Sequence, residues 1–382
     1  MDSDDHSVRR AVEGADFLEW NFTVMAAGSP SPWRIEEGMT QLLAHESAEG
    51  FALSLDVGLR EDANLIHELG RRRTPTAVAA LRGYAAMSTV DTQRDLARLH
   101  ADRLVGEGLP EPDWASRIGR VRVDGCHWAH DAFGETALVR CAFSYDGADA
   151  HGVLALIDRT IGDGLFRELT LSLDPDPWED ILRHAEKSDE GLIGEPLDPA
   201  YARRLFEDAV ATSDEVLGNP EYKVMRLPRA YRKMRALTLA RARALSDVAA
   251  PAEPFPDSVE LELLKRAFLT SGAAAALPAT YATRRALDLL FEQFVGHAGC
   301  HPLQLGPRRV QVTLGLSGLA PDQVDDPVVS RLLPDVAHAW ISWSATERGL
   351  SDDAAELLDR AAARACAALR PPGPGEQDAP RT

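Results

Sequence analysis

The sequence predicts an α+β protein that is mainly helical, with a four-stranded antiparallel meander sheet flanked by helical regions. Apolar residues recur at helical spacing over most of the chain, and near residue 118 this pattern gives way to an alternation of apolar and polar residues. Short connections separate the alternating segments. They indicate antiparallel neighbours, because parallel strands need crossovers of a dozen residues or more.

At 382 residues the chain is too long for one ordinary core, so several regions are expected. They are an N-terminal helical region over 1–117, a β-meander with one helix over 118–190, a helical region with a basic stretch over 191–248, a C-terminal helical region over 258–370 and a disordered tail over 371–382. The segment 249–257, rich in proline and alanine, is expected to be a linker.

The first region reads as helices joined by irregular stretches. Thr74 followed by Pro75 supplies a cap and a first-turn proline for a helix over 77–87. Asp91 is in position to cap the next helix, which is expected to end near Gly106.

The four strands are expected between residues 118 and 175. Apolar and charged residues alternate over 120–124, and a turn at Asp146-Gly147 separates two longer alternating segments. Leucines at alternate positions make a fourth strand over 169–173. One face of the sheet is expected to form a core that contains Val139, Phe143, Val153 and Ile157.

Aspartate–proline pairs mark helix starts in the remaining chain, because aspartate caps a helix and proline fits its first turn. They lie at Asp176, Asp198 and Asp326. Pro334 is expected to break the helix that begins after Asp326. The last helix is expected over 352–369, and Trp340 and Trp343 are expected in a helical core.

Composition predicts a cytoplasmic protein. The acidic start of the sequence is not followed by the apolar run of a secretory signal, and no segment has the roughly 20 apolar residues that span a bilayer. The four cysteines are scattered, as in a reducing compartment. A net charge of −19 disfavours broad association with nucleic acid or anionic membranes.

The segment from Lys223 to Arg243 contrasts with this acidity, because it holds eight cations and no acid. On a helical wheel of about 100° per residue, one face carries Arg229, Arg232, Lys233 and Arg243. Such a face is suited to bind an acidic partner, a phosphate or a nucleic-acid backbone. Alternatively, acids of the preceding helix neutralise it internally: Glu207, Asp208, Asp214 and Glu215.

Cysteine and histidine gather at 126–131 and 297–301, and zinc prefers these residue types. The chain has no Cys-x-x-Cys pair, however, and Cys141 is expected on an apolar sheet face. We therefore expect no bound metal and no cofactor.

An enzyme or small-ligand binder would have its pocket between the sheet and the helices, near His127, His130, Asp158 and Asp163. Ordinary turn chemistry also explains the two aspartates, which lie in a glycine-containing connection. No phosphate loop, dinucleotide fingerprint or nucleophile elbow is present.

The leading hypothesis is a non-enzymatic interaction protein that binds a partner protein or anionic ligand through helical surfaces, including the basic face over 223–243. The pocket is the alternative.

Three groups of residues resemble hypothetical proteins of high-GC Gram-positive bacteria. They are RRTPTA at 72–77, FGET at 133–136 through LID at 156–158, and AW at 339–340 through RGL at 348–350. The resemblance is spread over most of the chain and its motifs are loose. It implies a bacterial, cytoplasmic origin and supplies no activity and no catalytic residues.

Overall fold

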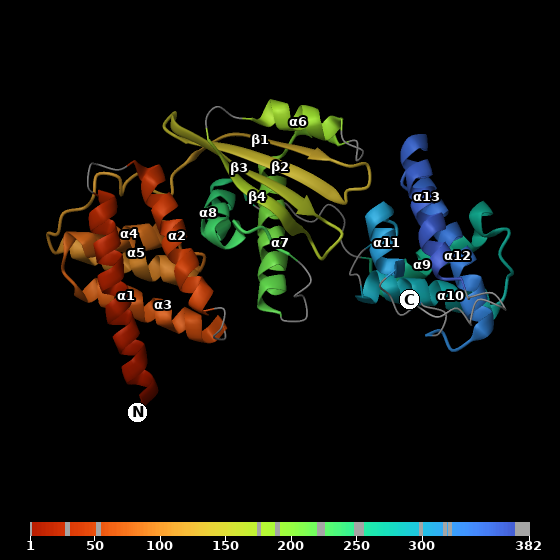
Figure 1. Ribbon diagram of the computed structural model, residues 1–382, viewed down its shortest axis with the longest axis horizontal. Coiled ribbons are helices and arrows are strands. Elements are labelled where there is room, and N and C mark those ends of the chain that lie inside the picture. The colour runs from red at the N-terminus through yellow and green to blue at the C-terminus, as the bar shows by residue number, and fades with distance from the viewer. Residues whose placement is uncertain are drawn as a thin grey trace, which may run out of the picture.

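The protein is described by a computed structural model that covers residues 2–26, 31–50, 55–173, 177–187, 192–219, 226–247, 256–297, 301–315, 319 and 323–370. N-terminal helices, a central antiparallel sheet and C-terminal helices follow one another along the molecule (Figure 1). The α+β, mainly helical class is confirmed. The expected tail over 371–382 lies outside the described residues, as do Asp176 and most of the expected linker.

Five helices form the N-terminal part: α1 Asp2–Ala26, α2 Pro32–Gly50, α3 Leu55–Arg71, α4 Pro75–Met87 and α5 Asp91–Gly106. Their apolar faces meet around Phe22, Met39 and Tyr84, which are fully buried. The predicted cap of α4 is present, because the Thr74 hydroxyl accepts a hydrogen bond from the Ala77 N–H. Asp91 does not cap α5. It is the first helical residue, one position too late for the cap.

The sheet has five strands, one more than predicted: β1 Arg122–His130, β2 Thr136–Tyr145, β3 Ala148–Asp158, β4 Leu165–Leu173 and β5 Ile193–Pro196. Their order is β4-β3-β2-β1-β5, and each pair is antiparallel. The extra strand β5 has only four residues, including a glycine and a proline, which leaves no alternation to detect. The predicted meander is confirmed, and its expected core residues Val139, Phe143, Val153 and Ile157 are fully buried.

Helices cover both faces of this sheet. α6 (Trp178–Glu186) lies on one face, where Trp178 packs in a small cluster with Ala129. α7 (Pro199–Gly218) and α8 (Tyr231–Ala244) lie on the other side (Figure 1). Asp198 caps α7 as expected, since its carboxylate accepts from the N–H groups of the first helical turn.

The C-terminal part consists of α9 Ser258–Thr270, the short turn η2 Gly272–Ala274, α10 Tyr281–Phe291, the π-helical segment η3 Glu292–His297, α11 Pro307–Gly315, α12 Pro327–Glu347 and α13 Asp352–Ala368. Trp340 and Trp343 are in its core, as predicted. Pro334 does not break α12 but lies inside it. A proline in a helix costs about 3 kcal/mol, and burial of the apolar side chains on either side of it, such as Leu333 and Val336, offsets that cost.

A buried carboxylate attaches the C-terminal helices to the sheet. Glu135, directly before β2, accepts hydrogen bonds from the backbone N–H groups of Arg308 and Arg309 at 3.0 and 2.8 Å. These N–H groups belong to the first turn of α11, whose dipole favours a negative charge. Arg348 donates to the carbonyl oxygen of Phe133 at 3.2 Å. The β1–β2 connection therefore anchors the C-terminal part, and the carbonyl oxygen of Arg159 between β3 and β4 adds a second attachment through the Arg309 side chain.

Candidate functional site

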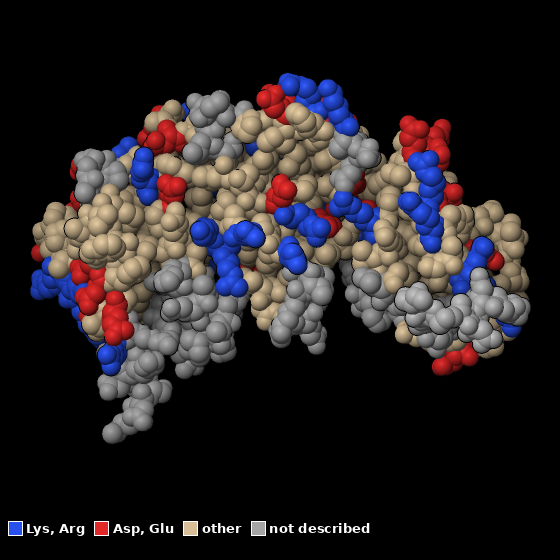
Figure 2. Space-filling view, in the orientation of Figure 1, with Lys and Arg blue, Asp and Glu red and all other residues tan. Residues whose placement is uncertain are grey.

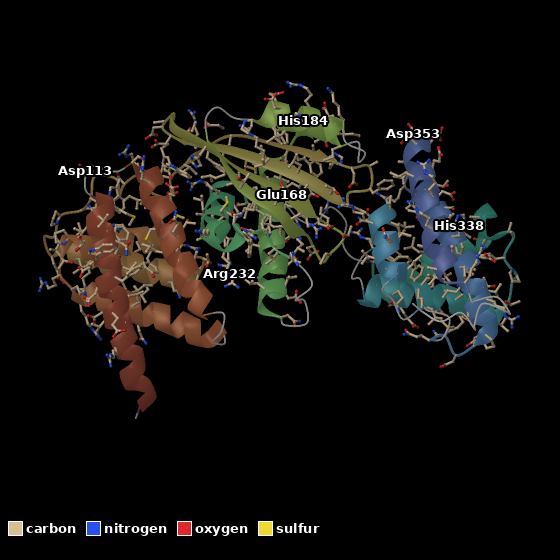
Figure 3. All side chains as sticks on the ribbon, in the orientation of Figure 1. Asp113, Glu168, His184, Arg232, His338 and Asp353 are labelled. Carbon is tan, nitrogen blue, oxygen red and sulfur yellow. The ribbon has the colours of Figure 1, made fainter. Side chains whose placement is uncertain are left out.

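The N-terminal end of the basic stretch lies on the surface. Arg226 and Arg229 precede α8, and Arg232 and Lys233 are in its first turn; all four are exposed. We call these four residues the basic segment. In Figure 2, lysine and arginine side chains gather in the middle of the view and continue toward α11. Figure 3 labels Arg232 in this region. Lys223 lies outside the described residues.

Tyr231 holds this end of α8 in place. Its ring is buried against Phe166 of β4, and its hydroxyl donates to the Asp214 carboxylate of α7 at 2.7 Å. Arg235, one turn further along α8, binds both oxygens of the same carboxylate. Asp214 therefore neutralises Arg235, as the internal-pairing alternative proposed. Glu207 and Asp208 instead pair with arginines of their own helix.

Arg243 does not share the exposure of the other three residues predicted with it. It is half-buried and donates to the carbonyl oxygen of Ala86 in α4 at 3.2 Å. Burial and the neighbouring charge of Arg94 lower its pKa to about 10. On the helical wheel, Arg243 lies on the same face as Arg232. The C-terminal half of α8, however, is inserted between the N-terminal helices and the sheet, so this face contacts protein there, which the wheel does not predict.

Arg229 also departs from the wheel, because it lies in a turn two residues before α8. Arg229 is nevertheless exposed, as Arg232 and Lys233 are, so these three residues lie on the surface as expected.

The inserted half of α8 contains a buried ion pair that the sequence did not reveal. The Arg241 guanidinium lies 2.6 Å from the Glu36 carboxylate of α2, and the two side chains are 1% and 0% exposed. Arg241 also donates to His151 Nε2 at 2.8 Å and to the Tyr145 hydroxyl at 3.1 Å. Burial and the charge of Arg241 lower the pKa of His151 to about 4, which keeps the imidazole neutral and able to accept.

A pattern in the sequence could have indicated this pair. Glu36 lies among Ile35 and Met39, which are fully buried, and Arg241 lies among the buried Ala240 and Ala242. A charged residue at an apolar position of an amphipathic helix needs a partner of opposite sign. The two charges can be recognised in this way, but the sequence does not say that they pair, because they are on distant helices.

The four residues of the alternative pocket do not converge. His127 faces the α6 side of the sheet, where its ring lies 6.1 Å from that of Trp178. His130, three positions along the same strand, faces the other side and lies 3.0 Å from Glu195 of β5. Asp158 accepts from the backbone and hydroxyl of Thr160, which is ordinary turn chemistry, and Asp163 is exposed in that turn.

A shallow groove lies elsewhere, on the C-terminal helices. Its volume is about 490 Å³, and it is lined mostly by alanine, leucine and proline side chains of η2, α12 and α13. Its charged or titratable lining residues are Asp335, His338, Cys366 and Arg370, and Figure 3 labels His338. None of the predicted site residues lies in it.

Among the described residues, no group of three or more histidine, cysteine or acidic side chains is placed to hold a metal ion. Cys300 lies outside those residues, so the cluster over 297–301 is described only in part. Within the same described ranges, no helix is long and apolar enough to cross a membrane. Comparison of the chain with protein-family models, curated proteins and solved structures finds no match to any of them.

Proposed function

We propose that this chain is a non-enzymatic interaction protein that binds an acidic surface of a partner protein through the basic segment. The observation that carries the proposal is the division of α8. In its C-terminal half, Arg241 is buried beside Glu36 and Arg243 is half-buried against the carbonyl oxygen of Ala86, whereas the basic segment at its N-terminal end is exposed.

The charge of the whole chain supports the same proposal. An exposed cluster of arginine and lysine is opposite in sign to the net charge of the chain, which is −19. Such a patch attracts and orients an acidic partner, while the net negative charge of the chain disfavours its binding at acidic parts of the surface. Arginine is also enriched where interfaces concentrate binding energy.

A protein partner is favoured over nucleic acid for reasons of charge density. The phosphate backbone carries one charge per about 1.7 Å of duplex, and a long duplex laid on this patch would also meet acids of the chain, such as Glu168 on β4 and Glu215 on α7, which are exposed. The acidic residues of a partner protein can be confined to the area that contacts the basic segment, so they need not meet these acids. The setting that the sequence predicts is a bacterial cytoplasm.

The test compares three proteins for binding to a fluorescent polyglutamate peptide and to a duplex DNA. They are the parent, the basic-segment variant Arg229→Glu/Arg232→Glu/Lys233→Glu, and a control variant Arg98→Glu/Arg183→Glu/Arg360→Glu. The control changes the net charge equally, at side chains that are 53%, 58% and 60% exposed on other helices.

We expect the parent and the control variant to bind polyglutamate more tightly than DNA, and the basic-segment variant to lose this binding. Absence of binding by the parent, or equal loss in both variants, would refute the proposal. Tighter binding of DNA, lost in the basic-segment variant alone, would replace the protein partner with a nucleic acid.

A further inference from the structure

Two cysteines occupy directly opposite positions on neighbouring strands. Cys126 of β1 is paired with Cys141 of β2, and the irregularity in this strand pair lies before them, at Val123/Gly125. Residues opposite each other in an antiparallel pair point to the same face of the sheet. Both thiols therefore lie on the α7 side, in a cluster with Leu197 and Ala202.

The hydrogen bonding of β1 identifies which kind of pair this is. The carbonyl oxygen of Cys126 accepts from the N–H of Leu197, beyond the end of β5, at 2.9 Å. In an antiparallel strand the N–H and C=O of one residue point to the same neighbour. Cys126 is thus bonded toward β5 and not toward β2, which makes Cys126/Cys141 a non-hydrogen-bonded pair.

The bonds at the end of the same strand pair agree with this assignment. The N–H of Asp131, five residues after Cys126, donates to the carbonyl oxygen of Thr136 at 3.4 Å. Odd-numbered residues of β1 therefore bond toward β2, and even-numbered ones, Cys126 included, bond away from it.

Such a pair has the spacing that a disulfide requires. The Cα atoms of a non-hydrogen-bonded pair lie about 4.5 Å apart, and the Cα atoms of disulfides lie about 4.4–6.8 Å apart. The side chains of these pairs also approach more closely than those of hydrogen-bonded pairs. A bond between the two sulfur atoms would need side-chain rotation and no change of strand register.

The two thiols differ in exposure and in pKa, so they are expected to differ in reactivity. Cys126 is 5% exposed and lies beside the short edge strand β5, whereas Cys141 has no exposed surface. The hydrogen bond with Cys141 and the charge of Arg140 lower the pKa of Cys126, and burial raises the pKa of Cys141. Thiolates are the reactive form, so Cys126 is the group that attacks first.

We propose that Cys126 and Cys141 form a redox-active dithiol that a small-molecule disulfide converts into a cross-strand disulfide. The Cys126 thiolate attacks the oxidant, forms a mixed disulfide and releases one thiol of the oxidant. Cys141 then attacks the Cys126 sulfur, and its proton passes to the departing thiolate, which leaves as the second thiol. Two protein thiols are oxidised and one disulfide of the oxidant is reduced to two thiols. This proposal does not depend on the proposed partner binding.

Cys366 provides the internal comparison. It is also buried, at 4% exposure, but its neighbours in the C-terminal core are not cysteines in the described part of the chain, and burial raises its pKa to about 12. If Cys126 and Cys141 serve only as small apolar core residues, they should resist oxidants, as we expect of Cys366.

The test uses the full chain with Cys300→Ser/Cys366→Ser, so that only the strand pair remains, and oxidised glutathione as the probe. We expect intact mass to fall by two hydrogens, and digestion without reductant to join the peptides that contain Cys126 and Cys141. Adding Cys141→Ser should trap a glutathione adduct on Cys126. Adding Cys126→Ser should slow the reaction of Cys141 by roughly tenfold or more, because it is buried.

Three outcomes would overturn the proposal. They are a stable glutathione adduct on Cys126 in the protein that retains Cys141, no reaction at either cysteine under native conditions, and equal reactivity in the two single-cysteine proteins. Peptide mapping of the parent chain after the same oxidation shows whether Cys126 and Cys141 become joined without any substitution. A variant that fails to fold therefore does not leave the question open.

Discussion

Replacing Arg241 by methionine tests the buried ion pair that fixes α8 between the N-terminal helices and the sheet. Methionine keeps much of the length and apolar contact of the arginine side chain but removes its charge and its donors. Three interactions disappear: the pairing with Glu36 at 2.6 Å and the hydrogen bonds to His151 and Tyr145. The Glu36 carboxylate, which has no exposed surface, then remains without its partner.

Removing one partner of a buried ion pair typically costs about 3–5 kcal/mol, because the remaining charge is uncompensated. We expect Arg241→Met to lower the free energy of unfolding by that amount. Glu36→Gln removes the charge on the other side while keeping an acceptor for the N–H of Gly119, which Glu36 binds at 2.7 Å. The double variant should therefore be more stable than Arg241→Met alone, since no buried charge is left unpaired.

Urea denaturation of the parent, both single variants and the double variant measures these effects. Arg232→Met is the matched control, because it makes the same substitution at an exposed position of the same helix. It should change stability by no more than about 0.5 kcal/mol. Equal midpoints for Arg241→Met and Arg232→Met, or additive losses in the double variant, would refute the structural role assigned to the pair.

Three further predictions concern other parts of the chain. Phe143→Ala should cost about 3–5 kcal/mol in the same assay as a core deletion, and an unchanged midpoint would show that the buried face of the sheet is misassigned. His151 has its pKa lowered to about 4 in the folded chain, so the stability it contributes is present above its unfolded pKa of about 6.5 and is lost as the pH falls from there toward 4. His151→Gln should flatten the fall in stability over that window, and an identical pH profile would contradict this. Elemental analysis of protein purified without a histidine tag or chelator should find far less than one zinc per chain. Near one zinc per chain, lost together with the fold in Cys126→Ala/His130→Ala, would show a metal site at β1.

Local patterns predicted most of the fold. The caps at Thr74, Asp198 and Asp326 and the alternation through Val139 and Phe143 depend on residues close in sequence, and the structure has them. The errors arise where tertiary packing decides. β5 is defined by its pairing with β1 and not by its own residues, and the C-terminal core holds α12 together across Pro334.

The candidate site was less accessible to sequence reasoning for a related reason. The sequence shows where cations are but not which of them are used inside the fold. Arg241 and Arg243 are two residues apart, yet one pairs with α2 and the other binds a carbonyl group of α4. The cross-strand cysteine pair depends on register in the same way. Cys126 and Cys141 were both recognised, but only the alignment of β1 with β2 places them opposite each other.

The salt dependence of polyglutamate binding tests the proposed function most directly. If the basic segment makes the contact, the affinity of the parent should fall steeply with salt, and Arg229→Glu/Arg232→Glu/Lys233→Glu should remove both the binding and its dependence on salt. The control Arg98→Glu/Arg183→Glu/Arg360→Glu should keep the slope of the parent, although its net charge equals that of the basic-segment variant. A slope shared by all three proteins would show that binding does not use the basic segment, and would contradict the proposed function.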